Sequence, residues 1–251
     1  MSKLSLIITA YDHHDLTVEH VKQVMRCQKV PDEIIVVNDG GTHDLKDKLL
    51  NEIGRQGEFC RSQLLDGKTT KLIYARIDED ILWNYNGACN LGTWLSTGDL
   101  VSFEDNDNLP SPEFYEQAIS LLSDPRNNIG RVIARKRYDI NNLETKEVIG
   151  KRGPNQGTYM IKREVLLNLK GQDEKFCGRY GWMYYDWRRR MLRSGIDFGM
   201  AGYYYYYVDG QSNIPHKNDK ANYSILRHNT RREKLQSSGG ILNFTYTWEV
   251  L

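Results

Sequence analysis

Two carboxylates stand two residues apart in this chain, at Asp105 and Asp107, directly after an apolar run at residues 100–103. On an extended chain such residues point the same way and lie about 6.6 Å apart along the strand. Two oxygen donors in that arrangement suit a hard divalent ion that bridges protein oxygens to phosphate oxygens. Acidic turns after strands are common, so the pair alone is weak evidence for a metal site. Its weight depends on the elements that position it.

The first hundred residues alternate between short apolar runs and stretches with helical spacing. We expect strands at residues 4–9, 33–38, 71–75 and 100–103, and helices at 16–28, 45–53 and 86–96. This order predicts an α/β fold, with a parallel, Rossmann-like sheet, right-handed crossovers and helices on both faces. Ligands of such sheets bind beyond the carboxyl ends of the strands. Residues 9–12, 38–41 and 104–107 are therefore expected at one edge.

The second half has a different pattern. We expect a helix at 112–122, strands at 131–135 and 157–161, a helix at 182–192, a long aromatic strand at 198–208 and a basic helix at 224–235. No linker separates the halves, so residues 1–110 and 111–251 are expected to form one compact domain in which the second half extends the same sheet.

Bulk properties exclude several classes of protein. The net charge of +1 argues against a nucleic-acid polymer as the main partner, because neutralising phosphates needs a basic excess. No apolar run is long enough to span a bilayer, and the N-terminus leads directly into a strand pattern. The four cysteines lack ligand-like spacing, so we expect reduced thiols in a cytoplasmic protein.

Polar residues at the first two strand ends have two interpretations each. Tyr11 could stack on a nucleotide base, or residues 9–12 could be an ordinary loop. Asp39 could accept a hydrogen bond from a pyrimidine N3–H or a ribose hydroxyl, or could simply serve a β-turn with the glycines that follow it.

Taken in order, the motifs resemble the inverting family 2 glycosyltransferases, which have the GT-A fold. The matching pieces are Ile7-Ile-Thr-Ala-Tyr-Asp12, Ile35-Val-Val-Asn-Asp-Gly40, Asn86-Gly-Ala-Cys-Asn-Leu-Gly92, Asp105-Asn-Asp107 with Pro110, and Gly171-Gln-Asp-Glu-Lys-Phe176. The resemblance covers about residues 4–235. It implies that the first half binds a nucleotide-sugar and that the second half binds an acceptor.

The resemblance also implies a donor site, with a UDP-sugar as the default donor. The residues at its nucleotide-sugar positions are Thr9, Ala10, Tyr11, Asp12, Asp39, Asn86, Gly87, Asn90, Asp105 and Asn106. Cys89 stands where the family usually carries an arginine, and Arg76 is a candidate substitute for that cation.

In the family, a DXD element binds Mn²⁺ or Mg²⁺, and it maps here to Asp105 and Asp107. A divalent ion stabilises the negative charge that builds on the departing diphosphate. The family often adds a histidine ligand after the last long strand. That position is Asp209 in this chain, and His216 is the other candidate.

Inverting transfer needs one general base, and Asp186 is the candidate for it because it is the only carboxylate in the comparable stretch, residues 178–190. It falls two residues later than the family's aspartate, which on a helix turns a side chain by about 200°. Either the helix begins later here, or Asp186 is a structural partner of the neighbouring arginines.

The acceptor is expected to be a glycan or another hydroxyl compound, with Trp182, Tyr184 and Tyr185 as aromatic platforms for sugar rings. The basic helix at 224–235 is expected to be a solvated face, and a peripheral membrane contact or an anionic acceptor is the alternative. Two rival functions remain: a sugar-phosphate nucleotidyltransferase, and a catalytically silent nucleotide- or glycan-binding protein.

Overall fold

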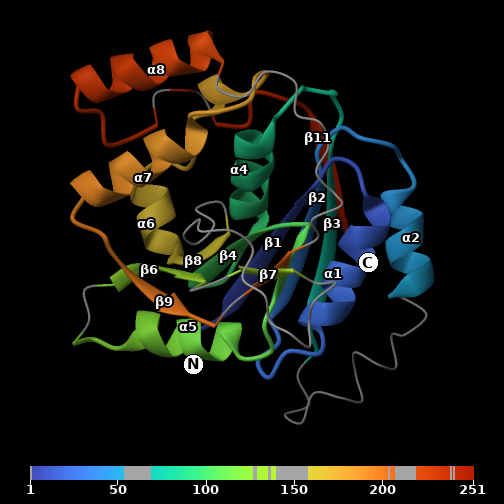
Figure 1. The fold of residues 1–251 in the computed structure, drawn as a ribbon. Coiled ribbons are helices and arrows are strands. Elements are labelled where there is room, and N and C mark those ends of the chain that lie inside the picture. The colour runs from blue at the N-terminus through green and yellow to red at the C-terminus, as the bar shows by residue number, and fades with distance from the viewer. Residues whose placement is uncertain are drawn as a thin grey trace.

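A computed structural model describes residues 2–53, 69–126, 129–134, 137–139, 158–202, 204–206, 219–237, 239 and 241–251. An eight-stranded sheet runs through the molecule in the order β11-β3-β2-β1-β4-β8-β6-β9 (Figure 1). Its four central strands are β1 (Leu4–Ala10), β2 (Glu33–Asn38), β3 (Lys71–Ile77) and β4 (Leu100–Asp105). These four pair in parallel, which confirms the parallel half expected from the apolar runs.

Helices cover both faces of this sheet, because continuous apolar strands must be buried on both sides. The helices α1 (His14–Val24), α2 (Leu45–Glu52) and α5 (Phe114–Ser123) pack on one face. The helices α4 (Tyr85–Leu95), α6 (Arg163–Asn168) and α7 (Met183–Arg193) pack on the other. Alternate residues of β1 serve the two cores, since Leu6 and Ile8 face the first and Ile7 the second.

The second half extends the sheet at both edges. On one side β8 (Tyr159–Lys162) pairs antiparallel with β4 and is followed by β6 (Ile129–Ala134) and β9 (Asp197–Ala201). On the other side β11 (Tyr246–Val250), which we did not expect, pairs antiparallel with β3. The helix α8 (Lys220–Arg231) packs on α7 and on the short 3-10 helix η3 (Glu174–Phe176).

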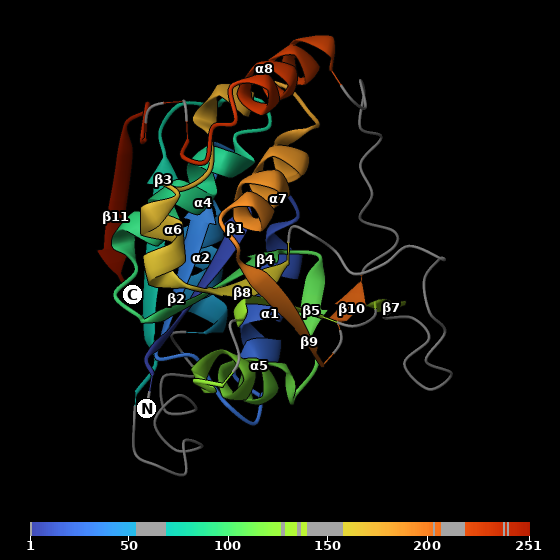
Figure 2. The same cartoon turned by 90° about the vertical axis from the view of Figure 1, so that its left-hand side faces the viewer.

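The strand expected at 198–208 is two strands, so that prediction was wrong. β9 ends at Ala201, and β10 (Tyr204–Tyr206) joins β5 (Asn108–Pro110) and β7 (Arg137–Asp139) in a separate sheet (Figure 2). Gly202 makes the break with φ +41°, and a Cβ there would lie 2.8 Å from Ser111 Oγ. Its N–H donates to Gln117 Oε1 at 3.0 Å.

Two further expectations can be checked against the described residues. Cys27, Cys89 and Cys177 are free, and Cys60 lies outside the described residues. No helix in the described part of the chain combines the length and the apolar character needed to cross a bilayer.

Candidate functional site

Three strand ends meet at one edge of the sheet, as expected. Thr9 of β1 pairs with Asp105 of β4, and Ala10 pairs with Asn38 of β2. The N–H of Asp39 donates to the carbonyl of Ala10 at 2.7 Å, so the first two loops are joined directly. The three predicted motifs therefore open onto the same space.

The first loop offers an aromatic ring and a carboxylate to this space. Tyr11 is 39% exposed and Asp12 is exposed, whereas Thr9 is half-buried and Ala10 is buried. The neighbouring Asp80 carboxylate raises the pKa of the Tyr11 hydroxyl, and partial burial adds to the rise.

The Asn106 side chain fastens the first loop to the DXD turn. Its amide donates to the carbonyl of Asp12 at 3.0 Å and to Thr17 Oγ1 at 3.2 Å. Both hydrogen bonds of the Asn106 amide thus go to protein atoms. Asn106 would therefore contribute to donor binding by holding Asp12 in place.

Asp39 is a buried carboxylate beside this loop. Its residue is only 6% exposed, and Oδ1 has no hydrogen-bond partner among the described residues. Burial raises its pKa to about 7, the Asp80 charge adds to the rise, and Asn84 partly offsets it. An acceptor atom without a donor is costly inside a protein, so Oδ1 is well suited to receive a ligand N–H.

Glycines allow the second loop to lie against the first. A Cβ on Gly41 would lie 1.8 Å from the carbonyl oxygen of Tyr11. Gly40 has φ +82°, and a Cβ on it would lie 2.7 Å from the carbonyl oxygen of Glu79.

Substituting Gly41 by alanine should therefore displace residues 11 and 12 and weaken nucleotide binding at least about tenfold, the effect of losing roughly 1.4 kcal/mol. Titration calorimetry with UDP would measure this loss. Gly199→Ala in β9 is the control, because Gly199 has no positive φ and a Cβ there would meet only side-chain atoms, at 3.3 Å or more. Equal UDP affinity in Gly41→Ala and the wild type would contradict this role of the loop.

Arg76 and Cys89 both contact other parts of the protein, and the substitution of Arg76 for the family's arginine stays a prediction. The Arg76 guanidinium donates to the carbonyls of Gly41 at 3.0 Å and Thr42 at 3.3 Å, so it braces the second loop. Cys89 is fully buried in the core beneath α4, and burial raises the pKa of its thiol far above the usual range.

The residues at the start of α4, which we expected to bind the nucleotide-sugar, form hydrogen bonds within the protein. Asn90 donates to the carbonyl of Gln172 and to Glu174, and its carbonyl oxygen accepts from the N–H of Gln172. Asn86 donates to the carbonyl of Asp173 at 2.9 Å.

Gly87 is covered as well, since a Cβ there would lie 2.7 Å from the ring of Phe244. Asn86 and Asn90 therefore hold residues 172–174, and Phe244 of the C-terminal segment packs on Gly87; their predicted role in nucleotide binding stays a prediction. The hydrogen-bond partners of Asn86 and Asn90 lie 82 or more residues away in the sequence, so no local sequence pattern predicts these contacts.

Asp105 and Asp107 end the third motif, and both are half-buried. Asn108 donates to Asp107 Oδ1 at 2.6 Å. Asp105 lies on the α4 side of the sheet near Tyr184. Burial raises the pKa of Tyr184 well above its usual value, and the Asp105 charge adds to this rise.

A buried polar cluster that we did not predict supports the DXD turn from the opposite face. Glu104 is 1% exposed and bonds to His20 Nε2 at 2.7 Å, Tyr115 Oη at 2.8 Å and Ser102 Oγ at 2.9 Å. Ser102 and Glu104 share a face of the buried strand β4, and this polar pair in an apolar run was the available sequence signal.

The residues around the DXD turn fit a divalent ion in part. Two carboxylates are enough for Mg²⁺ or Mn²⁺ when phosphate oxygens and water complete the coordination. No cluster of three ligand-type residues occurs within the described ranges. Asp209 and His216 lie outside the described residues, and β10 ends at Tyr206, which pairs with Asn108.

The environment of Asp186 favours its second interpretation, the structural one. The residue is 1% exposed. Oδ2 accepts from Arg190 Nε at 2.8 Å, and Oδ1 accepts from Arg189 Nη2 and Asn229 Nδ2, both at 3.1 Å. A general base must reach the proton that it removes. Protein donors occupy both oxygens of Asp186, which favours a structural role, and its assignment as the general base stays a prediction.

The three expected acceptor residues sit where α7 begins. Tyr184 packs edge-on to Tyr85 with ring centroids 5.5 Å apart. Tyr185 is 60% exposed, and Trp182 contacts it at 5.4 Å. Tyr184 therefore lies on the donor side, Tyr185 faces outwards, and Trp182 is half-buried beside it.

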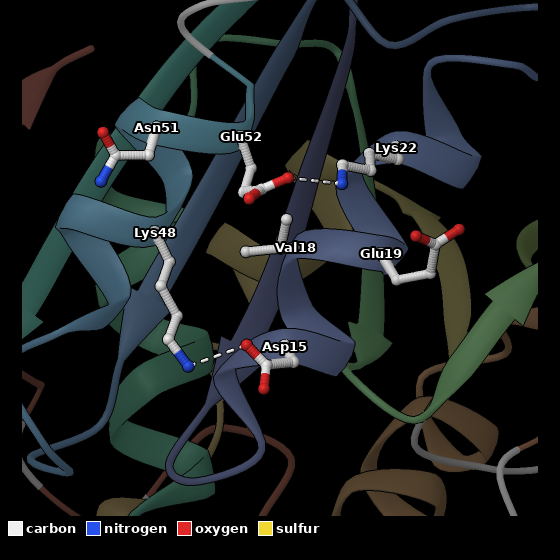
Figure 3. Close-up of a pocket in the computed structure, with 7 residues that line it drawn as sticks. All are labelled: Asp15, Val18, Glu19, Lys22, Lys48, Asn51 and Glu52. Carbon is white, nitrogen blue, oxygen red and sulfur yellow. Dashed lines mark hydrogen bonds and ion pairs between the residues drawn. The ribbon is translucent and has the colours of Figure 1, made fainter.

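One surface hollow lies between α1 and α2 (Figure 3). Its rim is closed by two ion pairs, Lys22 with Glu52 at 2.9 Å and Lys48 with Asp15 at 2.8 Å. Because the charges on the rim neutralise each other, we interpret this hollow as a solvated contact between two helices.

Comparisons with known proteins agree with this geometry. The model of the family described as "Glycosyl transferase family 2" matches residues 5–188. A search of curated proteins finds no match.

Among solved structures, the chain is similar to the mannosyltransferase PcManGT from Pyrobaculum calidifontis, in complex with GDP-Man and Mn²⁺. The identity is 19% and the TM-score 0.57, over 90% of this chain and 61% of that one. It is also similar to S. aureus TarS 1-349 in complex with UDP-GlcNAc, at 13% identity and TM-score 0.64, over 90% of this chain and 65% of that one. The chain thus spans less than two thirds of either structure.

Proposed function

Because the chain belongs to glycosyl transferase family 2 and its mixed sheet is that of a GT-A fold, we propose that it transfers a sugar from a nucleotide-sugar to an acceptor hydroxyl, with inversion at the anomeric carbon. The observation that carries the proposal is the shared strand-end edge. There Asp39 on one side of β1 and Asp105 on the other could contact the two ends of a nucleoside diphosphate.

We propose UDP as the nucleotide. The single orphan oxygen of Asp39 matches the single N–H on the pairing edge of uracil, whereas guanine presents two adjacent donors. The exposed ring of Tyr11 could then stack on the base.

Asp105 and Asp107 would hold Mn²⁺ or Mg²⁺. Such an ion, when bound, stabilises negative charge on the diphosphate as a Lewis acid. The protein's own part is to hold the two carboxylates in place. The Asn108 amide does this for Asp107, and strand pairing with Thr9 does it for Asp105.

Replacing Asp107 by asparagine tests this arrangement. We expect the wild type to bind UDP at least about tenfold more tightly with Mn²⁺ than without it, and the variant to lose that gain. Titration calorimetry with and without Mn²⁺ measures both. Asp15→Asn is the control, because Asp15 is an exposed carboxylate on α1 that pairs with Lys48. If the wild type binds UDP equally tightly with and without Mn²⁺, the assignment of Asp105 and Asp107 as metal ligands is refuted.

The burial of Asp186 favours one second candidate, a nucleotide- or glycan-binding protein without turnover. Within residues 178–202, the only other carboxylate is Asp197, at the start of β9. Release of UDP or GDP from a panel of nucleotide-sugars with Mn²⁺ present distinguishes the two functions. Tight UDP binding with no release from any donor, with or without a hydroxyl acceptor, would favour the silent protein.

A further inference from the structure

The outer face of α7 and α8 is basic and aromatic. The two helices pack together at the end of the molecule away from the N-terminus (Figure 1). Their exposed residues are Tyr185, Arg188, Leu192, Arg193, Lys220, Tyr223, Ser224, Arg227, His228 and Arg231. Not one of these is a carboxylate, although the whole chain carries 33 acidic residues against 34 basic ones. The exposed positions within the two helices are therefore basic or uncharged, and the acidic residues Asp219 and Glu233 lie just beyond the ends of α8.

Most of these cationic side chains form no ion pair within the described part of the protein. Arg193 lies 3.7 Å from Glu233. By contrast, Arg188, Lys220, Arg227 and Arg231 form no ion pair with any described residue. Unpaired cations on one surface create a positive potential that attracts anions.

Aromatic rings join this surface in a contiguous platform. Trp182 contacts Tyr185 at 5.4 Å and Tyr223 at 4.9 Å between ring centroids, and the Arg227 guanidinium lies 5.9 Å from the Tyr223 ring. Tyr185 and Tyr223 are 60% and 43% exposed. Trp182 also has φ +67°, a backbone conformation that L-residues rarely adopt and that is common at binding sites.

The platform lies next to the candidate donor site in the chain and in space. Tyr184, the neighbour of Tyr185, contacts Tyr85 and lies near Asp105. A chain-like ligand whose end reaches Asp105 could therefore continue outwards across Trp182 and Tyr223.

We propose that this surface, formed by Trp182, Tyr185, Tyr223, Arg227 and Arg231, binds an anionic carbohydrate acceptor. The rings pack on the apolar faces of sugar units, and the arginines pair with carboxylate, phosphate or sulfate groups along the chain. The proposal rests on the proposed transferase function and names its acceptor class.

A lipid surface fits the same face less well. A helix that lies on a membrane buries a broad apolar face among the acyl chains. The exposed positions of the two helices include a single aliphatic side chain, Leu192 of α7, and no Ile, Phe or Trp. Charge and flat aromatic rings without an apolar stripe favour a sugar polymer.

The probes are a galacturonic acid hexamer, its methyl ester and a heparin hexamer, added to the full chain and followed by tryptophan fluorescence and calorimetry. The acid and its ester share one backbone, and the ester replaces each carboxylate charge by a neutral methyl ester. We expect the acid or the heparin hexamer to bind, the ester to bind at least about tenfold more weakly, and binding to weaken between about 50 and 200 mM salt.

The double variant Arg227→Gln/Arg231→Gln should bind the anionic probe about fivefold more weakly and with a flatter salt dependence. Tyr223→Ala should lose affinity while the salt dependence stays. Lys71→Gln/Arg126→Gln removes the same charge from exposed sites at other places, the start of β3 and the end of α5, and should change neither.

Three results would overturn the proposal: no anionic probe binds at about 50 mM salt, acid and ester bind equally, or the control variant weakens binding as much as the double variant. Tighter binding to phosphatidylglycerol vesicles than to either oligosaccharide would assign the face to membranes instead. UDP titration on the same samples keeps the two proposals apart. In the wild type, intact UDP binding without glycan binding refutes the acceptor surface alone, and glycan binding without UDP binding refutes the donor site alone.

Discussion

Replacing Asp39 by asparagine should abolish the pH dependence of UDP binding. In the wild type the pKa of Asp39 is raised to about 7 by burial. The ionised carboxylate accepts the uracil N3–H as a charge-assisted hydrogen bond, which is stronger than the bond that the neutral acid could accept. Affinity should therefore fall as the pH drops through 7, by about tenfold from pH 8 to pH 6, because the ionised fraction falls by that factor.

Binding itself should also release a proton near neutral pH. A ligand N–H that donates to Asp39 stabilises the ionised form and lowers its pKa. Calorimetry in two buffers of different ionisation enthalpy measures this release. Asp12→Asn is the control, since it removes an exposed carboxylate from the same edge and should leave the pH profile as in the wild type. A pH-independent affinity in the wild type would show that Asp39 does not contact the base.

The same substitution should raise the stability of the protein at neutral pH. The folded pKa of Asp39 lies above its ordinary value of 3.8, so the folded state binds more protons between about pH 4 and 7. Stability consequently declines as the pH rises through that window. A rise from 3.8 to about 7 corresponds to on the order of 4 kcal/mol at about 1.4 kcal/mol per pKa unit. An amide at position 39 escapes this cost.

The sequence predicted the donor half of the fold well because its signals are local. Continuous apolar strands require burial on both faces, and this requirement brings Thr9, Asn38 and Asp105 to one edge. We did not predict the strand β11, although Tyr246, Trp248 and Val250 alternate with Thr247 and Glu249, which is a strand pattern. The break at Gly202 was hidden by the tyrosine run beside it.

The roles of the α4 residues could not be read from the sequence. Asn86 and Asn90 at the start of a helix look the same whether they bind a ligand or a distant loop. Only the fold shows that residues 172–174 and Phe244 occupy their surroundings. Asp186 carried a local signal, because Arg189 and Arg190 follow at i+3 and i+4. Its hydrogen bond from Asn229, 43 residues away, carried no such signal.

Replacing Asp186 by asparagine should destabilise the protein, and any loss of turnover should follow from that. The variant leaves Arg190 buried at 1% exposure without its carboxylate, and removing one partner of a buried pair costs about 3–5 kcal/mol. Arg190 also donates to the carbonyls of Leu169 and Gly171 at 3.0 and 2.9 Å. The damage should therefore extend to the loop that packs against Asn90.

Urea unfolding measures this loss, with Asp197→Asn as the control because Asp197 is an exposed carboxylate close to the end of α7. If Asp186 were the base, its asparagine variant would keep full stability and UDP binding and lose only turnover. Asn229→Ala gives a milder test that keeps the ion pair. It removes one donor from Asp186 Oδ1 and should cost about 1–3 kcal/mol.

A double-mutant cycle then separates the two roles. Asp186→Leu and Arg190→Met remove both charges together, so the pair should be less destabilised than the sum of the single variants, with a coupling energy on the order of 2 kcal/mol. A base acts on the acceptor and has no reason to couple to Arg190 in unfolding. Additive unfolding energies, together with lost turnover in a stable Asp186→Asn protein, would restore Asp186 as the base.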